Sequence, residues 1–251
     1  MSFVVVSGVN GQYSSAASAT TYLMQSPTST IPAGSTIMGV VACNNNTLAV
    51  SSCADNSTQA GAANVYTTET PQGSGVALSL CVFYCLKTTR AILVTDTITF
   101  TQTVAASRRA GTFNAWTPSN SNPTIDALVG TANSGMVTAS PVSVTVPANS
   151  DPASLAVEFA AWTNGAVTGA SGYSHTAPAS GWTSGVRVQS PSTAPVIEVG
   201  VSWNANLGST AGFTDTATYS SITRAFHNVR VVNDTPPKQK LTVVRRTWAR
   251  A

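Results

Sequence analysis

The hydrophobic residues of this chain follow two patterns that both predict β-strands. The segment 76–86 is apolar at odd and even positions alike, which is typical of a strand buried on both faces. In the segment 95–102, threonines alternate with other residues so that Ile98 and Phe100 share one face, as in a strand with one buried face. The polar residues 87–90 form a turn between the two segments. We therefore expect a central β-hairpin around which the rest of the fold is organised.

The same patterns recur along most of the chain, separated by clusters of Gly, Pro and Asn that are typical of turns. The segment 14–25 is rich in Ser, Ala and Thr, and there we expect a short helix. The segment 54–75 is polar and predicts a long connection, with one strand around residues 64–68. The other expected strands lie at 36–43, 47–53, 153–162, 185–189, 195–203 and 219–232, with a strand and loop at 105–123 and a short strand or extended arm at 3–9.

Strands at this spacing predict an all-β fold, an antiparallel β-sandwich of the jelly-roll type with extended N- and C-terminal arms. A chain of 251 residues can hold one large domain or two small ones. Each half alone would have too few strands to close a core, so we expect a single sandwich domain over residues 30–232. Residues 1–29 then form an N-terminal arm or short strand, and residues 233–251 form a basic C-terminal arm.

Composition narrows the class of protein. Only 8% of the residues are charged, while 43% are hydrophobic. The hydrophobic share excludes an intrinsically disordered chain. The scarcity of charge is common in extracellular adhesins and virion proteins and unusual in cytosolic enzymes. No apolar run approaches the ~18 residues of a membrane-spanning helix, and polar residues interrupt the apolar start of the chain after Val6. We therefore expect neither a membrane span nor a signal peptide.

Positive charge is concentrated at the C-terminal end. The net charge of +3 divides into five basic and no acidic residues from Lys238 onward, and seven basic and nine acidic residues before it. Pro236 and Pro237 end the sandwich, and the segment 238–248 has strand character but no partner nearby in sequence. We predict that this arm adds to the sheet of a neighbouring subunit, with Trp248 as the buried anchor. The alternative is a strand folded back onto its own sandwich. The predicted docking residues are Lys238, Lys240, Leu241, Val243, Val244, Arg245, Arg246, Trp248 and Arg250.

The four cysteines match the ligand spacing of no common zinc module. Cys81 and Cys85 share one face of the expected strand, about 13 Å apart, which is too far for a disulfide between them. We expect all four to be buried and reduced, as in a protein assembled in a cytoplasm. The alternative is a disulfide from Cys43 or Cys53 to the central hairpin. We expect no metal and no cofactor.

The chain offers little to an enzymatic mechanism. It has two histidines, His175 and His227, and no Gly-x-Ser-x-Gly motif of a serine hydrolase. The best catalytic candidates are Glu158 and Glu198, which would form a glycosidase pair if neighbouring strands held their carboxylates about 5 Å apart. Each glutamate alternates with apolar residues that face the core, so we expect both to point to solvent. We therefore expect no catalytic residue and no enzymatic activity.

A carbohydrate-binding module or adhesin is the alternative function of another class. Aromatic rings offer flat apolar faces on which sugars stack. Trp182 stands in a Ser/Gly-rich stretch that would present it on a loop, and Tyr173 lies shortly before it. These two residues are the predicted glycan contacts. Trp162 and Trp203 end apolar strands, so we expect them to pack in the core or at an edge.

The order of these segments resembles a known class of proteins. Ile-Pro-Ala-Gly-Ser at 31–35, the Val-Phe-Tyr strand at 82–84, the threonine-rich strand at 95–101 and the segments 146–162 and 197–203 are similar to the jelly-roll proteins of tailed-phage virions. The resemblance covers roughly residues 30–232 and is to small structural proteins of actinobacteriophages, the minor tail proteins and head-decoration proteins.

This resemblance implies a non-enzymatic virion protein that is assembled in the host cytoplasm. Its partners would be other virion proteins and copies of itself, so that it forms a homo-oligomer within the particle. A host cell-surface glycan is a further expected ligand. The basic arm fits an acidic partner protein as well as it fits a phosphate backbone, and we expect no nucleic-acid partner.

Overall fold

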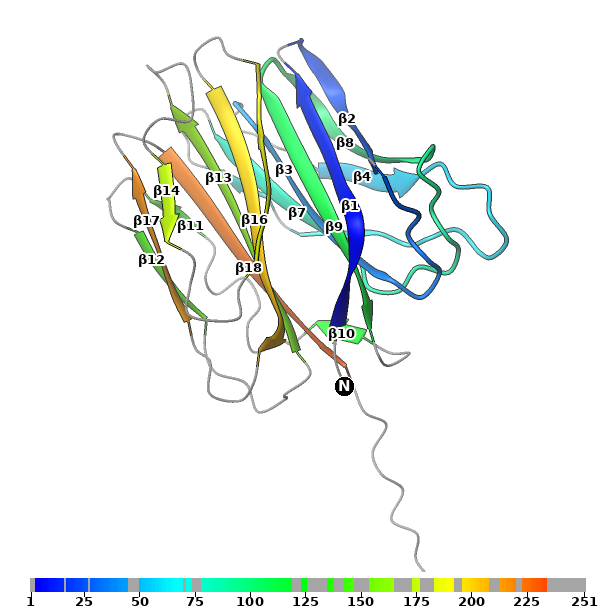
Figure 1. Cartoon of the computed structure of the whole chain (residues 1–251). Helices are drawn as coiled ribbons and strands as arrows, with labels where there is room; N and C mark the ends of the chain where they lie inside the picture. The colour runs from blue at the N-terminus through cyan, green and yellow to red at the C-terminus, as the bar shows by residue number, and fades with distance from the viewer. Residues whose placement is uncertain are drawn as a thin grey trace, which may run out of the picture.

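The computed structural model of the chain describes residues 3–15, 17–26, 28–44, 50–69, 71–73, 78–118, 123–125, 135–137, 142–146, 154–164, 173–176, 183–191, 196–207, 213–219 and 223–233. Every regular element within these ranges is a β-strand, so the predicted all-β class is confirmed (Figure 1). No helix in this part of the chain is long and apolar enough to cross a membrane.

The first half of the chain forms a nine-stranded antiparallel sheet. Its strands follow the order β4-β8-β2-β1-β9-β3-β7-β5, and β6 pairs with β7 beside β5. The strands are β1 (Phe3–Ser15), β2 (Ala19–Gln25), β3 (Thr36–Cys43), β4 (Val50–Asp55), β5 (Thr67–Thr68), β6 (Gln72–Gly73), β7 (Ser79–Cys85), β8 (Thr97–Ala106) and β9 (Arg109–Pro118).

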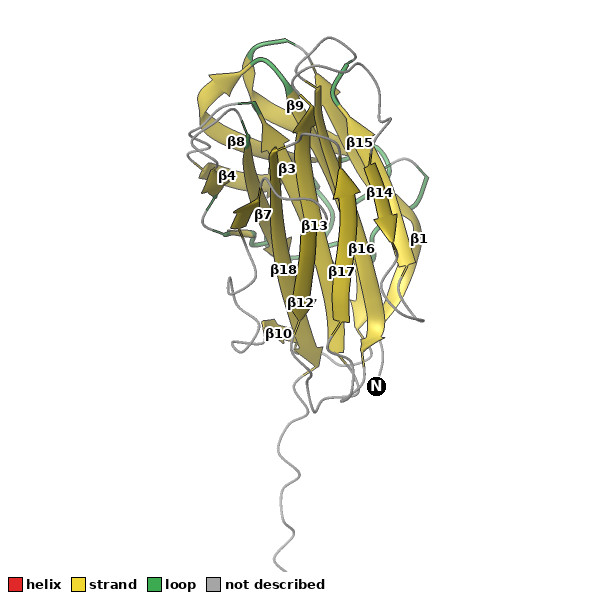
Figure 2. Cartoon of the chain, turned by 90° about the vertical axis from the view of Figure 1, so that its left-hand side faces the viewer, coloured by secondary structure: helices red, strands yellow, loops and turns green. Residues whose placement is uncertain are grey.

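The second half adds two smaller antiparallel sheets. A six-stranded sheet has the order β10-β18-β13-β16-β15, with β11 also paired to β18, and a three-stranded sheet has the order β12-β17-β14. Figures 1 and 2 show three layers, with the six-stranded sheet between the other two. The strands are β10 (Pro123–Ile125), β11 (Gly135–Val137), β12 (Val142–Val146), β13 (Ser154–Asn164), β14 (Tyr173–Thr176), β15 (Thr183–Gln189), β16 (Val196–Leu207), β17 (Phe213–Tyr219) and β18 (Thr223–Asn233).

Strands β3, β7 and β9 are buried on both faces and separate two apolar cores. In β3, Met38 and Val40 face the six-stranded sheet, while Ile37 and Val41 face the interior of the nine-stranded sheet. We call the first side the intersheet core; its buried members are Phe3, Met38, Val40, Ala42, Leu78, Leu80, Val82, Ala110, Trp116, Leu155, Val157, Phe159, Ala161, Val188, Ile197, Val199, Val201, Trp203 and Val231. We call the second side the inner core; its buried members are Val9, Tyr22, Met24, Ile31, Ile37, Val41, Cys43, Cys81, Phe83, Cys85, Ile92, Ile98, Phe100, Ala106, Phe113 and Ala115.

The inner core exists because the nine-stranded sheet curls over itself. Phe83 of β7 and Phe100 of β8 lie five strands apart in the sheet order, yet their ring centroids are 6.0 Å apart. The prediction that these two segments pair as a hairpin is therefore wrong. β7 pairs with β3, β5 and β6, whereas β8 pairs with β2 and β4. The connection between them is long enough to cross the curled sheet, and Ile92 forms a bridge with Ile31 on the way.

The two patterns that motivated the hairpin nevertheless identified strand burial correctly. Residues 79–85 are buried or half-buried at every position, and in β8 both Ile98 and Phe100 are fully buried. The strand expected at residues 36–43 is β3 with the same bounds. The strands expected in the second half coincide with β13, β15, β16 and β18 to within a few residues at each end, except that β16 continues to Leu207.

One expectation for the N-terminal region is wrong. The segment 14–25, where we expected a short helix, contains the end of β1 and all of β2. Tyr22 and Met24 are fully buried while Leu23 between them is 54% exposed, which is the period of two of a strand. Of the two alternatives for the start of the chain, an arm or a short strand, the structure has the strand, because β1 lies between β2 and β9 in the sheet. Alternating burial overrode the weak helix propensity of the serines and alanines.

Arg109 ties the β1–β2 end of the sheet to β9. Its guanidinium donates hydrogen bonds to the carbonyl of Thr21 and, at 3.0 Å, to that of Ala17. It also lies over the rings of Tyr13 and Tyr22, at 5.1 and 5.3 Å from their centroids. The side chain is only 2% exposed, so carbonyl oxygens and aromatic faces take the place of water around the charge.

We expect Arg109→Met to lower the free energy of unfolding by about 2–4 kcal/mol, because two charge-assisted hydrogen bonds and two cation–π contacts are lost. Arg108→Met, at the half-buried neighbouring residue, should cost less than about 1 kcal/mol. Urea unfolding followed by tryptophan fluorescence measures both changes. Equal losses in the two variants would contradict this role of Arg109.

Candidate functional site

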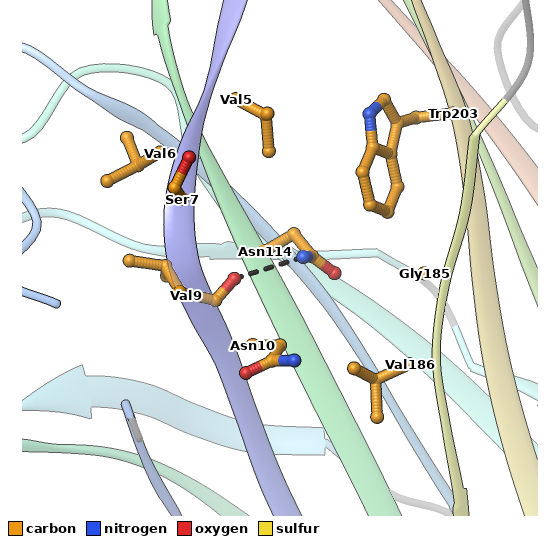
Figure 3. Close-up of a pocket in the computed structure, with 10 residues that line it drawn as sticks. Val5, Val6, Ser7, Val9, Asn10, Asn114, Gly185, Val186 and Trp203 are labelled. Carbon is orange, nitrogen blue, oxygen red and sulfur yellow. Dashed lines mark hydrogen bonds between the residues drawn. The ribbon is translucent and has the colours of Figure 1, made fainter. Parts of the chain in front are cut away.

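A cleft of about 400 Å³ opens where β1 of the first sheet faces β15 and β16 of the second. Figure 3 shows its walls, with the β1 and β9 side chains on one side and those of β15 and β16 on the other. Its lining residues are Val5, Val6, Ser7, Gly8, Val9, Asn10, Asn114, Gly185, Val186 and Trp203.

An irregular stretch of β1 creates this opening. Val5 pairs with Trp116 and Asn10 with Asn114, so four residues of β1 stand opposite a single residue of β9. Such a bulge bends its strand away from the regular ladder. Gly8 in the bulge has φ of 76°, and a Cβ there would lie 2.2 Å from the hydroxyl oxygen of Thr28. That hydroxyl donates a hydrogen bond to the Gly8 carbonyl at 3.1 Å, which holds the bulge in place.

Asn114 supplies the most distinctive polar group of the cleft. Its Nδ2 donates a hydrogen bond to the carbonyl of Val9 at 3.0 Å, which fixes the orientation of the amide. Asn114 is 4% exposed, and its Oδ1 is buried without a hydrogen-bond partner. Figure 3 shows this oxygen on the side of the amide that faces Gly185. Buried acceptors are nearly always satisfied, so this unpaired oxygen, which solvent does not reach, is an unusual feature of the packing between the layers.

Trp203 forms the opposite wall and joins the cleft to the intersheet core. Its ring packs edge-on against that of Trp116, with centroids 5.7 Å apart and an interplanar angle of 78°. Gly185 allows this packing, since a Cβ at that position would lie 2.5 Å from the Trp203 ring. Trp203 is 8% exposed, so the prediction that it packs in the core is confirmed, and its remaining exposed edge lines the cleft.

The glutamates proposed as a glycosidase pair do not point to solvent. Glu158 and Glu198 are 1% and 3% exposed, which makes that expectation wrong. They lie on the face of the six-stranded sheet opposite the intersheet core, which the three-stranded sheet overlies (Figure 2). The sequence pattern showed the alternation correctly, but a third layer covers the face that we assigned to solvent.

The same two carboxylates are too far apart for the expected chemistry. β13 and β16 are neighbours, as the glycosidase hypothesis required, but Glu158 pairs with Ser202 and Glu198 with Trp162. The glutamates are therefore offset by four residues along the strands, about 13 Å, well beyond the ~5 Å of a retaining pair. Glu198 instead accepts a hydrogen bond from Arg187 Nε at 2.7 Å and forms an ion pair with its Nη2 at 2.6 Å.

The structure adds little about the other predicted site residues. Trp182 and the whole arm from Lys238 to Arg250 lie outside the described residues. Tyr173 begins β14, opposite Tyr219, and His175 follows it opposite Ala217. His227 lies on β18 opposite Phe159. In the described part of the chain, no group of three or more His, Cys, Asp or Glu residues could hold a metal ion.

The four cysteines lie in the first half of the chain, and none of them is in a disulfide. Cys43, Cys81 and Cys85 are buried members of the inner core, and half-buried Cys53 packs against it. Burial raises the pKa of Cys85 to about 11 and raises the pKa of Cys53 and Cys81 well above the ordinary range of a thiol. A protonated, buried thiol is a poor nucleophile and a poor metal ligand, so these residues serve packing.

These thiols predict a loss of stability at alkaline pH. In the unfolded chain the cysteines ionise near pH 8.5, whereas the folded chain keeps them protonated through their raised pKa. The unfolded state then binds fewer protons, so the free energy of unfolding falls by roughly 1.4 kcal/mol per pH unit for each such group as pH rises above about 8.5. Burial raises the pKa of the Tyr22 and Tyr66 phenols as well, and they extend the loss above about pH 10.

Urea unfolding between pH 7 and pH 10.5 measures this slope. A variant with alanine at Cys53, Cys81 and Cys85 should show a flatter dependence below pH 10, whatever its stability at pH 7. The thiols of the native protein should also react slowly with an aromatic disulfide reagent at pH 8. Rapid reaction, or a stability independent of pH in this range, would show that the thiols are accessible and ionise normally.

Nothing in the sequence pattern revealed the cleft, because its lining comes from three separate parts of the chain that meet only in the fold: residues 5–10, Asn114, and Gly185, Val186 and Trp203. Gly8 and Gly185 were the available signals, but a glycine alone does not say what approaches it. Comparisons with known proteins add no further assignment: no protein-family model, no curated protein and no solved structure matches this chain. The resemblance to phage virion proteins therefore stays a prediction.

Proposed function

We propose that the chain is a non-enzymatic structural component of a tailed-phage virion, a minor tail protein that assembles with other virion proteins and with copies of itself. The observation that carries the proposal is the layered all-β body, in which three central strands are buried on both faces and only 8% of all residues are charged. A body of this kind has a firm shape and a polar surface with little charge, which suits permanent contact with other proteins. A capsid decoration protein is the alternative within this class.

The chemistry of the described residues supports a role without catalysis. Catalytic groups need access to substrate and a pKa suited to proton transfer or nucleophilic attack. Cys81 and Cys85 are buried, with thiol pKa values raised away from neutral pH. Glu198 is buried and engaged by Arg187. Cysteines of the inner core that form no disulfide also fit a protein assembled in a reducing cytoplasm.

The C-terminal arm is the proposed means of assembly. All five basic residues after Pro237 lie in one short segment that also carries Leu241, Val243, Val244 and Trp248. An apolar strand added to a neighbour's sheet gains backbone hydrogen bonds and buries its side chains. The basic residues would then pair with acidic groups of that neighbour at the rim of the contact.

Deletion of residues 238–251 should leave a folded, soluble body that no longer enters the particle. Trp248→Ala should reduce incorporation at least tenfold, because a buried aromatic anchor typically contributes 2 kcal/mol or more to such a contact. Thr247→Ala, in the same segment, is the matched control and should enter normally. Mass spectrometry of particles purified from cells that supply only the variant protein measures incorporation, and urea unfolding measures the stability of the body.

Two results would contradict this assembly model. Unfolding of the truncated protein would show that the arm belongs to its own core. Normal incorporation of the truncated protein would show that assembly uses another surface.

A further inference from the structure

We infer that residues 3–7 of β1 form an open sheet edge to which the C-terminal arm of a second copy of this chain adds as a strand. The inference rests on the proposed use of the arm in assembly, and it names the surface that receives the arm. We call residues 3–7 the β1 edge.

The β1 edge has a strand partner on one side only. Residues 3–5 pair with residues 116–118 of β9. On the other side of β1, the described pairing joins Gln12 to Gln25 of β2, and no described residue pairs with the β1 edge there. Figure 1 shows β2 beside the later part of β1. The open stretch ends at Gly8, whose carbonyl accepts a hydrogen bond from the Thr28 hydroxyl. Such an edge presents backbone N–H and C=O groups with which another strand can pair.

The side chains of the β1 edge are apolar on both faces. Val4 is 60% exposed and Val5 is 36% exposed, and they are the only consecutive pair among the exposed large hydrophobic residues of the described chain. Successive side chains of a strand point to opposite faces, so each face of the sheet exposes a valine here. β1 contains no charged residue and no proline, which are two common means of keeping an edge from pairing.

The other edge strands of the described sheets carry such protection. β4 includes the charged Asp55, and β15 includes Arg187 beside a shift in its register with β16. β12 lies between Pro141 and Pro147 in the sequence. β5, β6, β10, β11 and β14 have only two to four residues each, and very short strands offer little to a partner. Within the described chain, the β1 edge is therefore the one best suited to receive a strand.

The arm has the pattern that this edge calls for. In an extended segment, Leu241 and Val243 fall on one face and Val244 on the other. A strand at residues 240–244 therefore covers Val4 with one face and Val5 with the other. Five residues of strand span about 17 Å, well within the segment 238–248. β1 has no charged residue to repel the basic residues of the arm.

The link before the arm favours a second copy over the arm's own body. β18 ends at Asn233, at the end of the molecule where β1 begins (Figure 1). Thr235 precedes Pro236, which precedes Pro237. A residue before proline is held extended, and proline-rich links are stiff. We therefore expect the link to lead onward from β18 rather than to reverse at once onto its own β1. Because arm and edge belong to the same end of the molecule, two copies can exchange arms.

Cross-linking of the full chain tests this contact. A benzophenone-bearing amino acid replaces Thr242, and the protein is equilibrated with ¹⁵N-labelled native protein before irradiation. The cross-linked peptides should join position 242 of one copy to residues 3–7 of a copy that carries the other isotope. Mass spectrometry identifies the joined residues and shows whether they come from one copy or from two.

Substitutions at the edge provide the second measurement. Val4→Lys combined with Val5→Lys should weaken self-association at least tenfold, because charges on an edge strand oppose pairing and repel a basic arm. Val65→Lys combined with Val94→Lys is the matched control, since these valines are 76% and 38% exposed and lie outside the strands. Analytical ultracentrifugation over a range of concentrations measures the dissociation constant, and urea unfolding checks that both variants are folded. If the edge variant does not fold, the cross-links of the native edge decide alone.

Four results would overturn the inference. These are a native chain that does not self-associate, cross-links to residues 3–7 of the same copy, cross-links that reach another strand, or equal self-association by the folded edge variant and its control. The proposed function fails separately, through normal incorporation of the protein that lacks residues 238–251. Loss of incorporation on that deletion, with cross-links that avoid the β1 edge, would leave the assembly model standing and refute this docking surface alone.

Discussion

Burial of β3, β7 and β9 on both faces is the constraint on which the rest of the structure depends. A strand whose side chains are apolar on both faces needs an apolar cover on each side. The curl of the nine-stranded sheet supplies one cover, through residues such as Tyr22, Ile98 and Phe100 of β2 and β8. The six-stranded sheet supplies the other, through residues such as Phe159 and Val199. Each fully buried side chain of this kind stabilises the fold by about 1.5–3 kcal/mol.

The same constraint accounts for where the cleft lies. Over most of their area the two large sheets are held together by the intersheet core, and Trp116 and Trp203 contact each other across it. Beside this contact, the bulge of β1 takes residues 6–9 out of register with β9. The second sheet continues past that point through β15, so the layers separate there and leave the Asn114 amide between them. The cleft thus forms where the two sheets do not pack against each other, beside the β1 bulge that the contact between Gly8 and Thr28 holds in place.

Much of the fold could be predicted from the sequence, because burial leaves a direct trace in the order of residues. The two-sided apolar run of β7 and the one-sided alternation around Ile98 and Phe100 both gave the correct burial. The order of residues contains no comparable signal for which strands pair with each other. β7 and β8 are consecutive among the long strands, but the curl of the sheet places them face to face instead of edge to edge. The helix expected over residues 14–25 was wrong for another reason. It rested on the Ser, Ala and Thr content of the segment, whereas the alternating burial of Tyr22, Leu23 and Met24 is that of a strand.

The candidate site could be predicted less well, because it depends on layers that no local pattern reveals. Glu158 and Glu198 have the alternation of solvent-facing residues, but the three-stranded sheet overlies that face and they are buried. Asn114 lies in a strand that is buried along most of its length. In the sequence it reads as one polar residue among apolar neighbours. Only the fold shows that Nδ2 of its amide is bonded to the Val9 carbonyl while Oδ1 is buried without a partner.

Hydrogen–deuterium exchange of the full chain, resolved by mass spectrometry, tests most directly whether the two halves share one core through β3, β7 and β9. If they do, the amides of β3, β7 and β9 exchange last, together with those of β13 and β16, and all of them respond to urea with one free energy of opening. Exchange of β13 and β16 in a separate, earlier opening, while β3, β7 and β9 keep their full protection, would show that the second half is not needed to bury the central strands and would contradict the shared core.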